Sequence, residues 1–348
     1  MRFRIKPVPR FAGLASWGAV LRLAVLGILL GGLIAMIVKM PGRSHQGPLP
    51  PLTAQEAALS SELRQDVQKL SGEIGERNTV CYRELTAAAD FIEAALTESG
   101  YQVFRHEYVA AGRLCRNLIA ETRGTKLPEE IIVVGAHYDS VLGCPGANDN
   151  ASGVAALLAL ARRFAGKPNE RTIRFVAFVN EEPPHFLTRR MGSLVYARLC
   201  RERGDKIVSM LSLETIGCYF DSKGSQKYPW PFSFFYPATG NFVGFVGNLA
   251  NRKLVAKAIG VFRRETAFPS EGAALPGLVP GVGWSDHWSF WKCGYPGIMV
   301  TDTAPYRYPH YHELTDTPEQ LDYERMTRVV AGLGRVIARL ANPGRPST

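Results

Sequence analysis

Several apolar, strand-like runs in this chain end on a histidine or a carboxylate, and this pattern constrains the fold more than any other feature. From residue 131 onward such runs alternate with helical segments, which predicts βαβ units and a largely parallel sheet. Ligands bind outside the carboxyl ends of strands in open α/β sheets. The runs are 131–134 before His137, 172–179 before Glu181 and Glu182, 209–213 before Glu214, and 297–300 before Asp302 and the loop that carries His312. Imidazole and carboxylate groups gathered at one edge of a sheet predict a metal site.

The other elements support an α/β fold with a mostly parallel (mixed) central sheet and helices on both faces. Apolar residues recur at helical spacing in two segments before residue 100, and Gly100 stops the second one. A cluster of residues typical of helix starts, 148–153, precedes a further helix. The predicted helices are 54–70, 84–99 and 154–164, and further strands are predicted at 102–109 and 117–121. The 348 residues suffice for one large domain of this class with a short extension.

The net charge of +10 is distributed unevenly along the chain. Residues 1–50 hold seven Lys or Arg and no acid, which leaves only +3 for the remainder. No basic stripe interleaved with aromatic residues follows, as a nucleic-acid groove would need. We therefore expect no nucleic-acid partner.

The N-terminus has the character of a membrane segment. The run 23–38 is apolar throughout, and extending it back through Arg22 gives a length that can cross a bilayer. Four basic residues precede the segment and two follow, so the positive-inside rule places residue 1 in the cytoplasm and the bulk of the chain outside it. The predicted division is a cytoplasmic tail at 1–14, a transmembrane anchor at 15–40, a stiff Pro/Gly linker at 41–53 and a globular domain at 54–348.

A cleaved signal peptide is the alternative for this segment, because it has the same order of basic and apolar residues. No clean small-x-small cleavage site follows, since the apolar run ends in Val38-Lys39-Met40-Pro41. The uncleaved anchor is therefore the preferred interpretation.

Six cysteines occur without any C-x-x-C spacing, which argues against a thiolate zinc ribbon. Outside the cytoplasm some of them would be expected to pair. Plain buried thiols are the equally weighted alternative. The positions are Cys81, Cys115, Cys144, Cys200, Cys218 and Cys293.

The acidic residues near the predicted strand ends suggest a division of labour. Glu181 and Glu182 are neighbours at the end of a strand, so their side chains leave on opposite faces. One can hold a metal while the other addresses a group beside it. Asp139 follows His137 by two residues, where its carboxylate can accept the other ring N–H and orient the imidazole. Asp149 lies in a loop rich in Gly and Asn, from which it can reach between two cations.

Taken together, these residues resemble the cocatalytic dizinc aminopeptidases, metallopeptidase family twenty-eight of the bacterial leucine-aminopeptidase type. The resemblance runs in the same order from about residue 70 to about residue 335. No G-x-S-x-G motif of a serine hydrolase is present. The matching strings are His137-Tyr138-Asp139-Ser140, the segment 146–153, Asn180-Glu181-Glu182, Met191-Gly192-Ser193, Ser285-Asp286-His287, and His312 with Asp316-Thr317.

The resemblance implies two Zn²⁺ ions per chain and a role for each matched residue. Asp149 would bridge the ions, and Glu181 would be the general base on a metal-activated water. It also implies a cis peptide between Asp149 and Asn150. The remaining ligands would be His137 and Glu214 at one ion, and Glu182 and His312 at the other.

Two positions depart from the family pattern or leave a choice. The ligand at Glu214 is an aspartate in many relatives, and the longer side chain puts the metal spacing or preference in doubt. His310 lies two residues before His312, which is favoured because Asp316-Thr317 follows it at the distance found in the family.

The candidates for substrate binding are Tyr306, Tyr308, Tyr311 and His287, with a structural role equally open for His287. The aromatic stretch 218–245 is either a wall of the substrate cleft or the core of an insertion.

The resemblance implies a membrane-anchored zinc exopeptidase that removes N-terminal residues from peptides outside the cytoplasm. A glutaminyl cyclase of the same superfamily is the first alternative, but it uses one zinc and lacks the histidine at position 137. A non-catalytic, receptor-like ectodomain of the same fold is the second, but such proteins lose ligands that this chain retains. Carboxypeptidase and endopeptidase activity stay open, as do the residue preference, the native metal and the oligomeric state.

Overall fold

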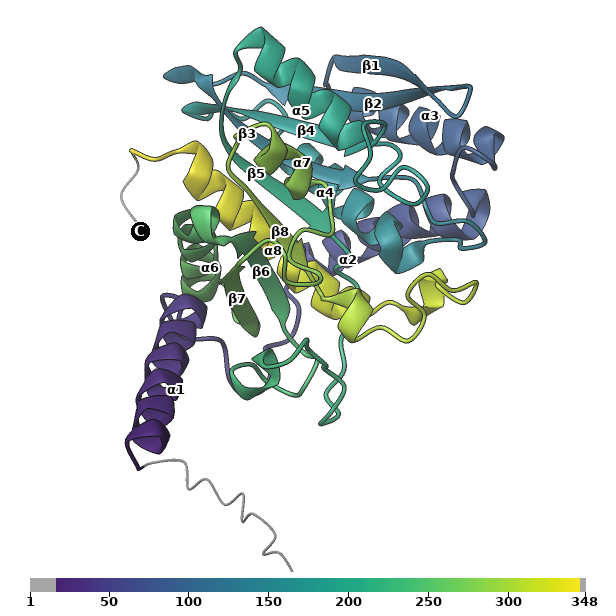
Figure 1. Ribbon diagram of the computed structural model, residues 1–348. Helices are drawn as coiled ribbons and strands as arrows, with labels where there is room; N and C mark the ends of the chain where they lie inside the picture. Colours follow the sequence, from purple (N-terminus) through teal and green to yellow (C-terminus); the bar gives the residue numbers. More distant parts are fainter. Residues whose placement is uncertain (1–16, 345–348) are drawn as a thin grey trace, which may run out of the picture. The chain divides into compact units, whose positions relative to one another are not determined.

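A computed structural model describes residues 17–344, and its central element is an eight-stranded mixed sheet (Figure 1). The strand order is β1-β2-β4-β3-β5-β8-β6-β7. Strands β4, β3, β5 and β8 run parallel to one another, β6 and β7 form a second parallel pair, and β1–β2, β2–β4 and β6–β8 are antiparallel. The strands are β1 Val103–Ala110, β2 Arg113–Thr122, β3 Leu127–His137, β4 Arg171–Phe178, β5 Lys206–Glu214, β6 Val243–Asn248, β7 Ser270–Leu275 and β8 Gly297–Thr301.

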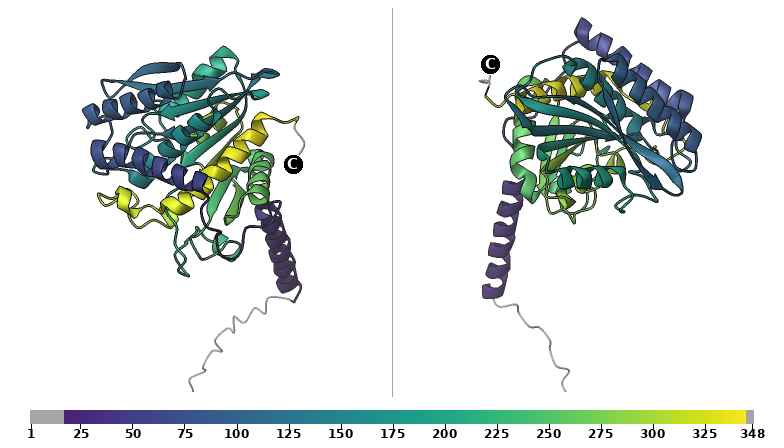
Figure 2. Two further views of the ribbon diagram at one scale, coloured as in Figure 1. Left: turned by 180° about the vertical axis from the view of Figure 1, so that it is seen from behind. Right: turned by 90° about the horizontal axis from the view of Figure 1, so that it is seen from above.

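Helices cover both faces of this sheet, which confirms the predicted α/β architecture (Figure 2). The larger apolar core lies under α3 Tyr82–Glu98, α4 Gly153–Phe164, α6 Arg252–Glu265 and α8 Tyr323–Ala341, with α2 Ala54–Val67 packed outside α4 and α8. The smaller core lies on the opposite face under α5 Gly192–Arg203 and α7 His287–Lys292.

The alternation of side chains along each strand decides which residues face which core. In β3, Ile132 and Val134 enter the larger core, whereas Ile131 and Val133 enter the smaller one. The same alternation in β5 sends Leu213 to the larger core and leaves the following residue, Glu214, on the face of α5 and α7. The residues that end β3 and β5, His137 and Glu214, therefore lie on the face of the sheet that carries α5 and α7.

Most elements predicted from periodicity are present. The helix predicted at 54–70 begins at a capping box, in which Glu56 N donates to Thr53 Oγ1 (3.2 Å) and Thr53 N donates to Glu56 Oε2 (2.9 Å). It continues as a π-helical turn over Gln68–Ile74. Strands β6 and β7 were not predicted, because Val243–Asn248 and Ser270–Leu275 are short, contain glycine and lack clear alternation.

The predicted linker is packed on the domain rather than extended as a spacer. Met40 is buried, and the Arg263 guanidinium donates to the carbonyl oxygens of Pro41 and Gly42 (both 3.3 Å). The Ser270 amide of β7 donates to Ser44 Oγ (2.8 Å). Residues 40–44 thus support strand β7. The predicted domain boundaries themselves stay a prediction.

Among the described residues before Met40, Trp17–Val38 form the helix α1, of 22 residues. Among residues 17–344, no helix has both the length and the apolar character that crossing a membrane requires. The transmembrane anchor predicted at 15–40 is therefore not supported by the described helices. The predicted cytoplasmic tail at 1–14 lies outside the described residues.

All six cysteines are free thiols, and four of them, Cys115, Cys144, Cys200 and Cys218, are buried. The expectation that some would pair is not met, and the alternative of plain buried thiols describes the structure.

Candidate metal centre

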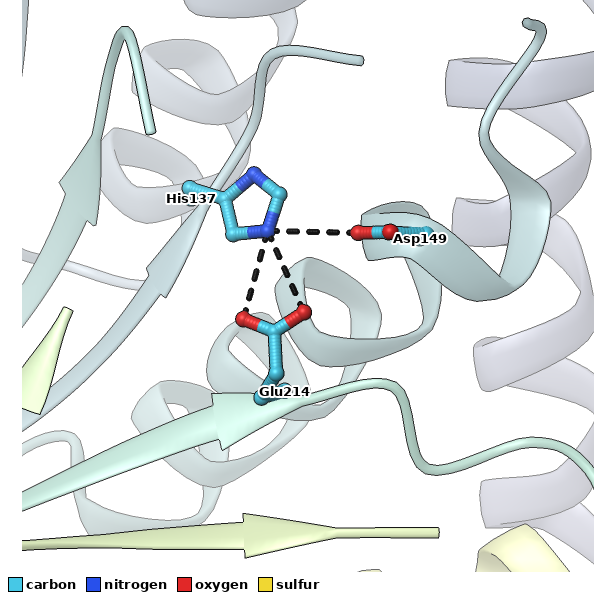
Figure 3. Close-up of side chains that lie close together, drawn as sticks. All are labelled: His137, Asp149 and Glu214. Atoms are coloured by element: carbon cyan, nitrogen blue, oxygen red, sulfur yellow. Dashed lines mark hydrogen bonds and ion pairs between the residues drawn. The ribbon is translucent and has the colours of Figure 1, made fainter. Parts of the chain in front are cut away.

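The structure brings five of the predicted residues together in two groups that share one carboxylate. In the first group His137 Nε2 lies 3.3 Å from Asp149 Oδ1 and 3.3 Å from Glu214 Oε2 (Figure 3). In the second group His312 Nε2 lies 3.2 Å from Asp149 Oδ2 and 3.4 Å from Glu182 Oε2. The two oxygens of Asp149 thus face different groups, as a bridging ligand requires.

The sheet explains why residues so distant in sequence meet. His137 ends β3 and Glu214 ends β5, and these strands are parallel neighbours. Glu182 follows β4, the neighbour of β3 on the other side, whose Phe178 is in register with His137. The carboxyl ends of parallel strands lie at one edge of a sheet, so each strand delivers its ligand to the same place. His312 reaches it from the loop that follows β8.

Hydrogen bonds between side chains and backbone hold the loop that carries Asp149. Two loop amides donate to Asp316, and the loop residue Asn150 bonds to the backbone at the end of β5. The Asp316 carboxylate accepts from the amides of Asn148 (2.8 Å) and Asp149 (3.1 Å). The Asn150 amide side chain donates to Leu213 O (2.8 Å) and accepts from Thr215 N (3.1 Å), which ties the loop to the end of β5. The Asp149–Asn150 peptide is cis, as the resemblance implied.

Arg77 is a supporting residue that the sequence did not reveal. Its fully buried guanidinium donates to Tyr138 O (2.8 Å), Gly146 O (3.0 Å) and Leu70 O (3.0 Å), among other carbonyls. Burial disfavours the charged form and lowers its pKa to about 10, which leaves it cationic at neutral pH. Arg77 therefore fixes the segment that leads from β3 to the Asp149 loop.

Asp139 supports the site in a different way from the one predicted. The His137 Nδ1 atom lies 3.2 Å from the backbone carbonyl oxygen of Asp139, whereas the nearer carboxylate oxygen is 3.6 Å away. The carboxylate instead accepts from the amides of Glu181 (3.1 Å) and Glu182 (3.0 Å). Asp139 therefore orients the ring through its main chain and holds the two glutamates through its side chain.

Glu181 lies beside the centre without belonging to either group of three. It is buried, and its Oε2 atom is 3.9 Å from His137 Nε2. Burial raises its pKa well above the usual range, and the carboxylates of Glu214 and Glu182 add to this effect against the opposing charge of His137. A carboxyl group in this position is suited to accept and hold a proton.

The remaining pKa shifts show that the centre carries more negative charge than its histidines balance. Burial, together with the charge of Asp149, raises the pKa of Glu182 to about 7. Burial would lower the pKa of His312, but the nearby carboxylates of Asp149 and Glu182 prevail and raise it to about 10. The carboxylates of Glu214 and Glu181 likewise raise the pKa of His137 against the effect of burial. Such a cluster favours the binding of cations.

The five residues fit zinc on three observations. Their donor atoms within each group all lie within 4.8 Å of one another. Imidazole nitrogen and carboxylate oxygen are ligands that zinc takes in catalytic sites. Three buried polar atoms, Asp149 Oδ1, Glu182 Oε1 and His312 Nε2, make no hydrogen bond, although buried polar atoms are normally satisfied.

A mostly apolar pocket adjoins the centre and reaches Glu214. Tyr306 and Tyr311 line it, and the Tyr311 ring stacks on His312 at 3.9 Å between centroids. Part of the aromatic stretch 218–245 also lines it, namely Tyr228, Phe232, Tyr236 and Phe242. This part of the stretch is thus a pocket wall.

The other two candidates for substrate binding do not line the pocket. Tyr308 is buried and donates to Asp316 Oδ1 (2.8 Å), so it supports the Asp149 loop. His287 is fully buried in α7 and its Nε2 lies 2.8 Å from Val282 O, while burial lowers its pKa to about 4. A neutral His287 that donates to Val282 holds a pocket-lining segment from behind. His310 belongs to neither metal group and bonds to Thr315 Oγ1 (2.8 Å).

Asp286 is a further residue whose position the sequence did not predict. It is fully buried, neither carboxylate oxygen has a hydrogen-bond partner, and burial raises its pKa to about 7. Its neighbour Ser285 donates to Glu214 Oε2 (2.7 Å). Of the string Ser285-Asp286-His287, Ser285 is thus the residue that orients Glu214.

An α/β sheet with histidine and carboxylate ligands at its strand ends, beside a pocket that can take an organic group, defines a metal-dependent hydrolase. The chain belongs to peptidase family M28, whose family model matches residues 117–337. It is 35% identical to the uncharacterized protein YfbL of Escherichia coli (strain K12) over 285 residues, which are 79% of this chain and 87% of that protein.

The chain is also similar to a protein that is named as an aminopeptidase and to a solved aminopeptidase structure. A probable leucine aminopeptidase of Trichophyton verrucosum is 26% identical over 291 residues, which are 78% of this chain and 70% of that protein. The structure of BSAP, a zinc aminopeptidase from Bacillus subtilis, superposes with a TM-score of 0.64 at 15% identity and covers 83% of this chain and 96% of that chain. The second similarity shows a shared fold.

Proposed function

We propose that this chain is a zinc-dependent aminopeptidase with two zinc ions per chain. The observation that carries the proposal is the pair of three-residue groups that share Asp149, with Glu181 beside them. His137, Asp149 and Glu214 would hold one ion, and Asp149, Glu182 and His312 the other. The names of the similar proteins, a probable leucine aminopeptidase and a zinc aminopeptidase, support the same activity.

The residues of the chain divide the work of peptide hydrolysis. Zinc bound here supplies Lewis acidity and lowers the pKa of water. Glu181 Oε2 accepts the proton of the attacking water and passes it to the nitrogen of the leaving amine, a step usually worth about 10²–10⁴ in rate. Asp139 holds Glu181 in place through the Glu181 amide. Because Glu181 is buried, little bulk water competes for that proton.

The charges around the pocket favour an aminopeptidase over a carboxypeptidase. A carboxypeptidase needs a cation for the terminal carboxylate of its substrate, and none of the described pocket-lining residues is Lys or Arg. The carboxylates of the centre instead suit the terminal ammonium group.

Two of the alternatives lose support from the same residues. A cyclase with a single zinc does not need two complete groups of metal ligands that include His137. A non-catalytic, receptor-like ectodomain does not need either group. All five ligand positions hold competent side chains in contact with one another.

The place of action is a separate part of the proposal and rests on the sequence alone. We propose that the catalytic domain lies outside the cytoplasm, with the N-terminus inside and residues 15–40 as the anchor. The apolar run 23–38 and its basic flanks support this. Activity of the full chain in the membrane fraction, sensitive to protease from outside, is the expected result. A soluble chain with a new N-terminus near residue 40 would show a signal peptide instead.

The activity is tested by metal content together with matched substrates. We expect two zinc per chain, and cleavage of aminoacyl anilides that is abolished when the amino group is acetylated. Removal of zinc by a chelator should abolish cleavage, and added zinc should restore it. Release of residues from the C-terminus of a peptide, or equal cleavage of acetylated and free substrates, would overturn the proposal.

A further inference from the structure

Four strands place one residue each in a straight row across the sheet, from the metal centre to the far edge. Glu214 of β5 is in register with Thr301 of β8, Thr301 with Gly244 of β6, and Gly244 with Glu271 of β7. Residues in register point to the same face, and all four line the apolar pocket. The row is therefore the floor of the pocket, with a candidate metal ligand at one end and a second carboxylate at the other.

The length of the floor follows from the sheet itself. Neighbouring strands lie about 4.8 Å apart, so three steps separate the Glu214 and Glu271 backbones by about 14 Å. Gly244 lies between them and adds no side chain to the middle of the floor. On this face of β6 and β7 no described helix covers the sheet, since α5 packs on β2 and α7 packs on β5 and β8.

The walls are apolar because the hydroxyl groups of the tyrosines donate hydrogen bonds to backbone carbonyl oxygens. Tyr236 donates to Gly272 O (2.9 Å), Tyr228 to Pro237 O (2.7 Å) and Tyr306 to Pro280 O (3.2 Å). Their rings therefore face the pocket as hydrocarbon surface. Such walls suit a chain of methylene groups and also attract a cation through the ring faces.

Among the described residues that line the pocket, Glu271 is the only acid apart from Glu214, and its charge is incompletely balanced. Its side chain is 22% exposed, and Arg263 Nη2 approaches Glu271 Oε2 only to 3.5 Å, longer than the 2.7–2.9 Å typical of charge-assisted bonds. The Arg263 guanidinium is directed mainly to backbone, with Nη2 donating to Ser270 O at 2.7 Å. Burial raises the pKa of Glu271, against the charge of Arg263 and a hydrogen bond from Ser44. A carboxylate in an apolar pocket with so weak a partner favours a second cation.

We propose that this pocket receives the side chain of the N-terminal residue and that Glu271 selects lysine and arginine there. The inference rests on the aminopeptidase function proposed above. With bonds of about 1.5 Å, a lysine or arginine side chain extends roughly 6–7 Å from Cα, whereas leucine reaches roughly 3–4 Å. Added to a hydrogen bond of about 2.8 Å, the longer side chains span roughly 9–10 Å of the floor of about 14 Å, so they reach the Glu271 end from a substrate Cα that lies about one strand spacing in from Glu214, over Thr301. Leucine leaves the far end unfilled.

The test compares side chains that differ in charge more than in length. On zinc-loaded full-length protein, kcat/KM for lysyl and arginyl anilides should exceed that for the norleucyl anilide. Glu271→Gln keeps the shape and removes the charge, so it should lower kcat/KM for the lysyl and arginyl substrates about 10- to 100-fold and leave the norleucyl value within about 2-fold. Glu265→Gln is the matched control, because Glu265 ends α6 away from the pocket lining, and it should change neither.

Binding of the product amino acids separates this inference from the proposed function. Calorimetry should show that L-lysine binds more tightly than L-norleucine, and that Glu271→Gln removes the difference. Cleavage without a lysine or arginine preference, or a preference that survives in Glu271→Gln, overturns the role of Glu271 and leaves the aminopeptidase standing. Lysine binding that depends on Glu271 without any cleavage supports the pocket and overturns the aminopeptidase.

A second variant keeps the inference testable if Glu271→Gln fails to fold. Glu271→Asp retains the charge but withdraws it by one methylene, so it should raise the ratio of arginyl to lysyl cleavage, since arginine is the longer side chain. An unchanged ratio in a folded Glu271→Asp protein also overturns the proposal.

Discussion

The metal centre and the apolar pocket adjoin at Glu214, yet they are built in opposite ways. The centre takes its groups from the ends of β3, β4 and β5 and from two loops, and backbone amides or buried side chains hold its loops in place. The pocket takes its floor from one face of β8, β6 and β7, and its walls from aromatic rings. The metal centre holds charged side chains in fixed positions, whereas the pocket provides an apolar surface of a certain shape.

The difference teaches where each kind of substitution should act. A change in the centre leaves buried charges without partners, which affects metal content and turnover together. A change around the pocket alters contacts to the substrate or the stability of a wall, and leaves the metal in place. The predictions below test this separation, beginning with the largest effect.

The largest effect is expected at Asp149, the residue that both metal groups share. Asp149→Asn replaces the bridging carboxylate with a weak neutral ligand, so zinc should fall below one per chain and turnover should drop at least about 10³-fold, since zinc supplies the activated water. Zinc per chain and kcat on an aminoacyl anilide measure both effects. Asp90→Asn, an exposed aspartate of α3, is the control and should match the unmodified protein. Two zinc per chain in a folded Asp149→Asn protein would show that Asp149 is not the bridge.

A smaller effect is expected at Asp316, which touches no ligand oxygen but holds the Asp149 loop. Asp316→Asn retains the shape and loses one acceptor for the amides of Asn148 and Asp149. Zinc affinity should fall by about 10- to 100-fold, the usual effect of removing a group that orients a ligand. Tyr308→Phe removes only one donor to the same carboxylate and should have a clearly smaller effect. Equal zinc affinities in the Asp316→Asn and unmodified proteins would separate the loop from the centre.

The smallest effect is expected at His287, behind the pocket wall. Its pKa of about 4 in the folded protein lies below the value of about 6.5 in an unfolded chain, so acid favours unfolding. This contribution to stability is fully present above pH 6.5 and is lost as the pH falls toward 4, by about 2 kcal/mol between pH 7 and pH 5. Urea unfolding of the wild type and of His287→Gln at both pH values measures it. Because both proteins share the metal centre, the difference between their pH dependences reports on His287 alone, and equal dependences would contradict its buried neutral state.

The two regions also differ in how far the sequence revealed them. The candidate ligands were visible because histidines and carboxylates directly follow apolar runs such as 131–134 and 209–213, and strand ends meet at one edge of a parallel sheet. The pocket floor was not visible, because β6 and β7 owe their strand conformation to pairing with β8 and to each other rather than to composition. A role for Glu271 can be inferred only from the strand register that aligns it with Glu214.

The supporting residues were hidden for a related reason. Arg77 acts through carbonyl groups more than 60 residues away, and nothing in its local sequence distinguishes it from a surface arginine. Asp139 was expected to bind His137 through its carboxylate, but two free amides at the end of β4 are better donors in that position. Hydrogen-bond partners of this kind depend on the tertiary fold, which periodicity does not specify.

The most direct test of the central claim compares the adjacent glutamates, which the structure assigns to different environments. Glu182 contacts His312 within a metal group, whereas Glu181 lies beside both groups. Glu181→Gln should retain two zinc per chain and an unchanged melting temperature while kcat falls by about 10²–10⁴. Glu182→Gln should lose zinc as well as activity. A Glu181→Gln protein with near-normal kcat, or one that has lost its zinc, would contradict the account.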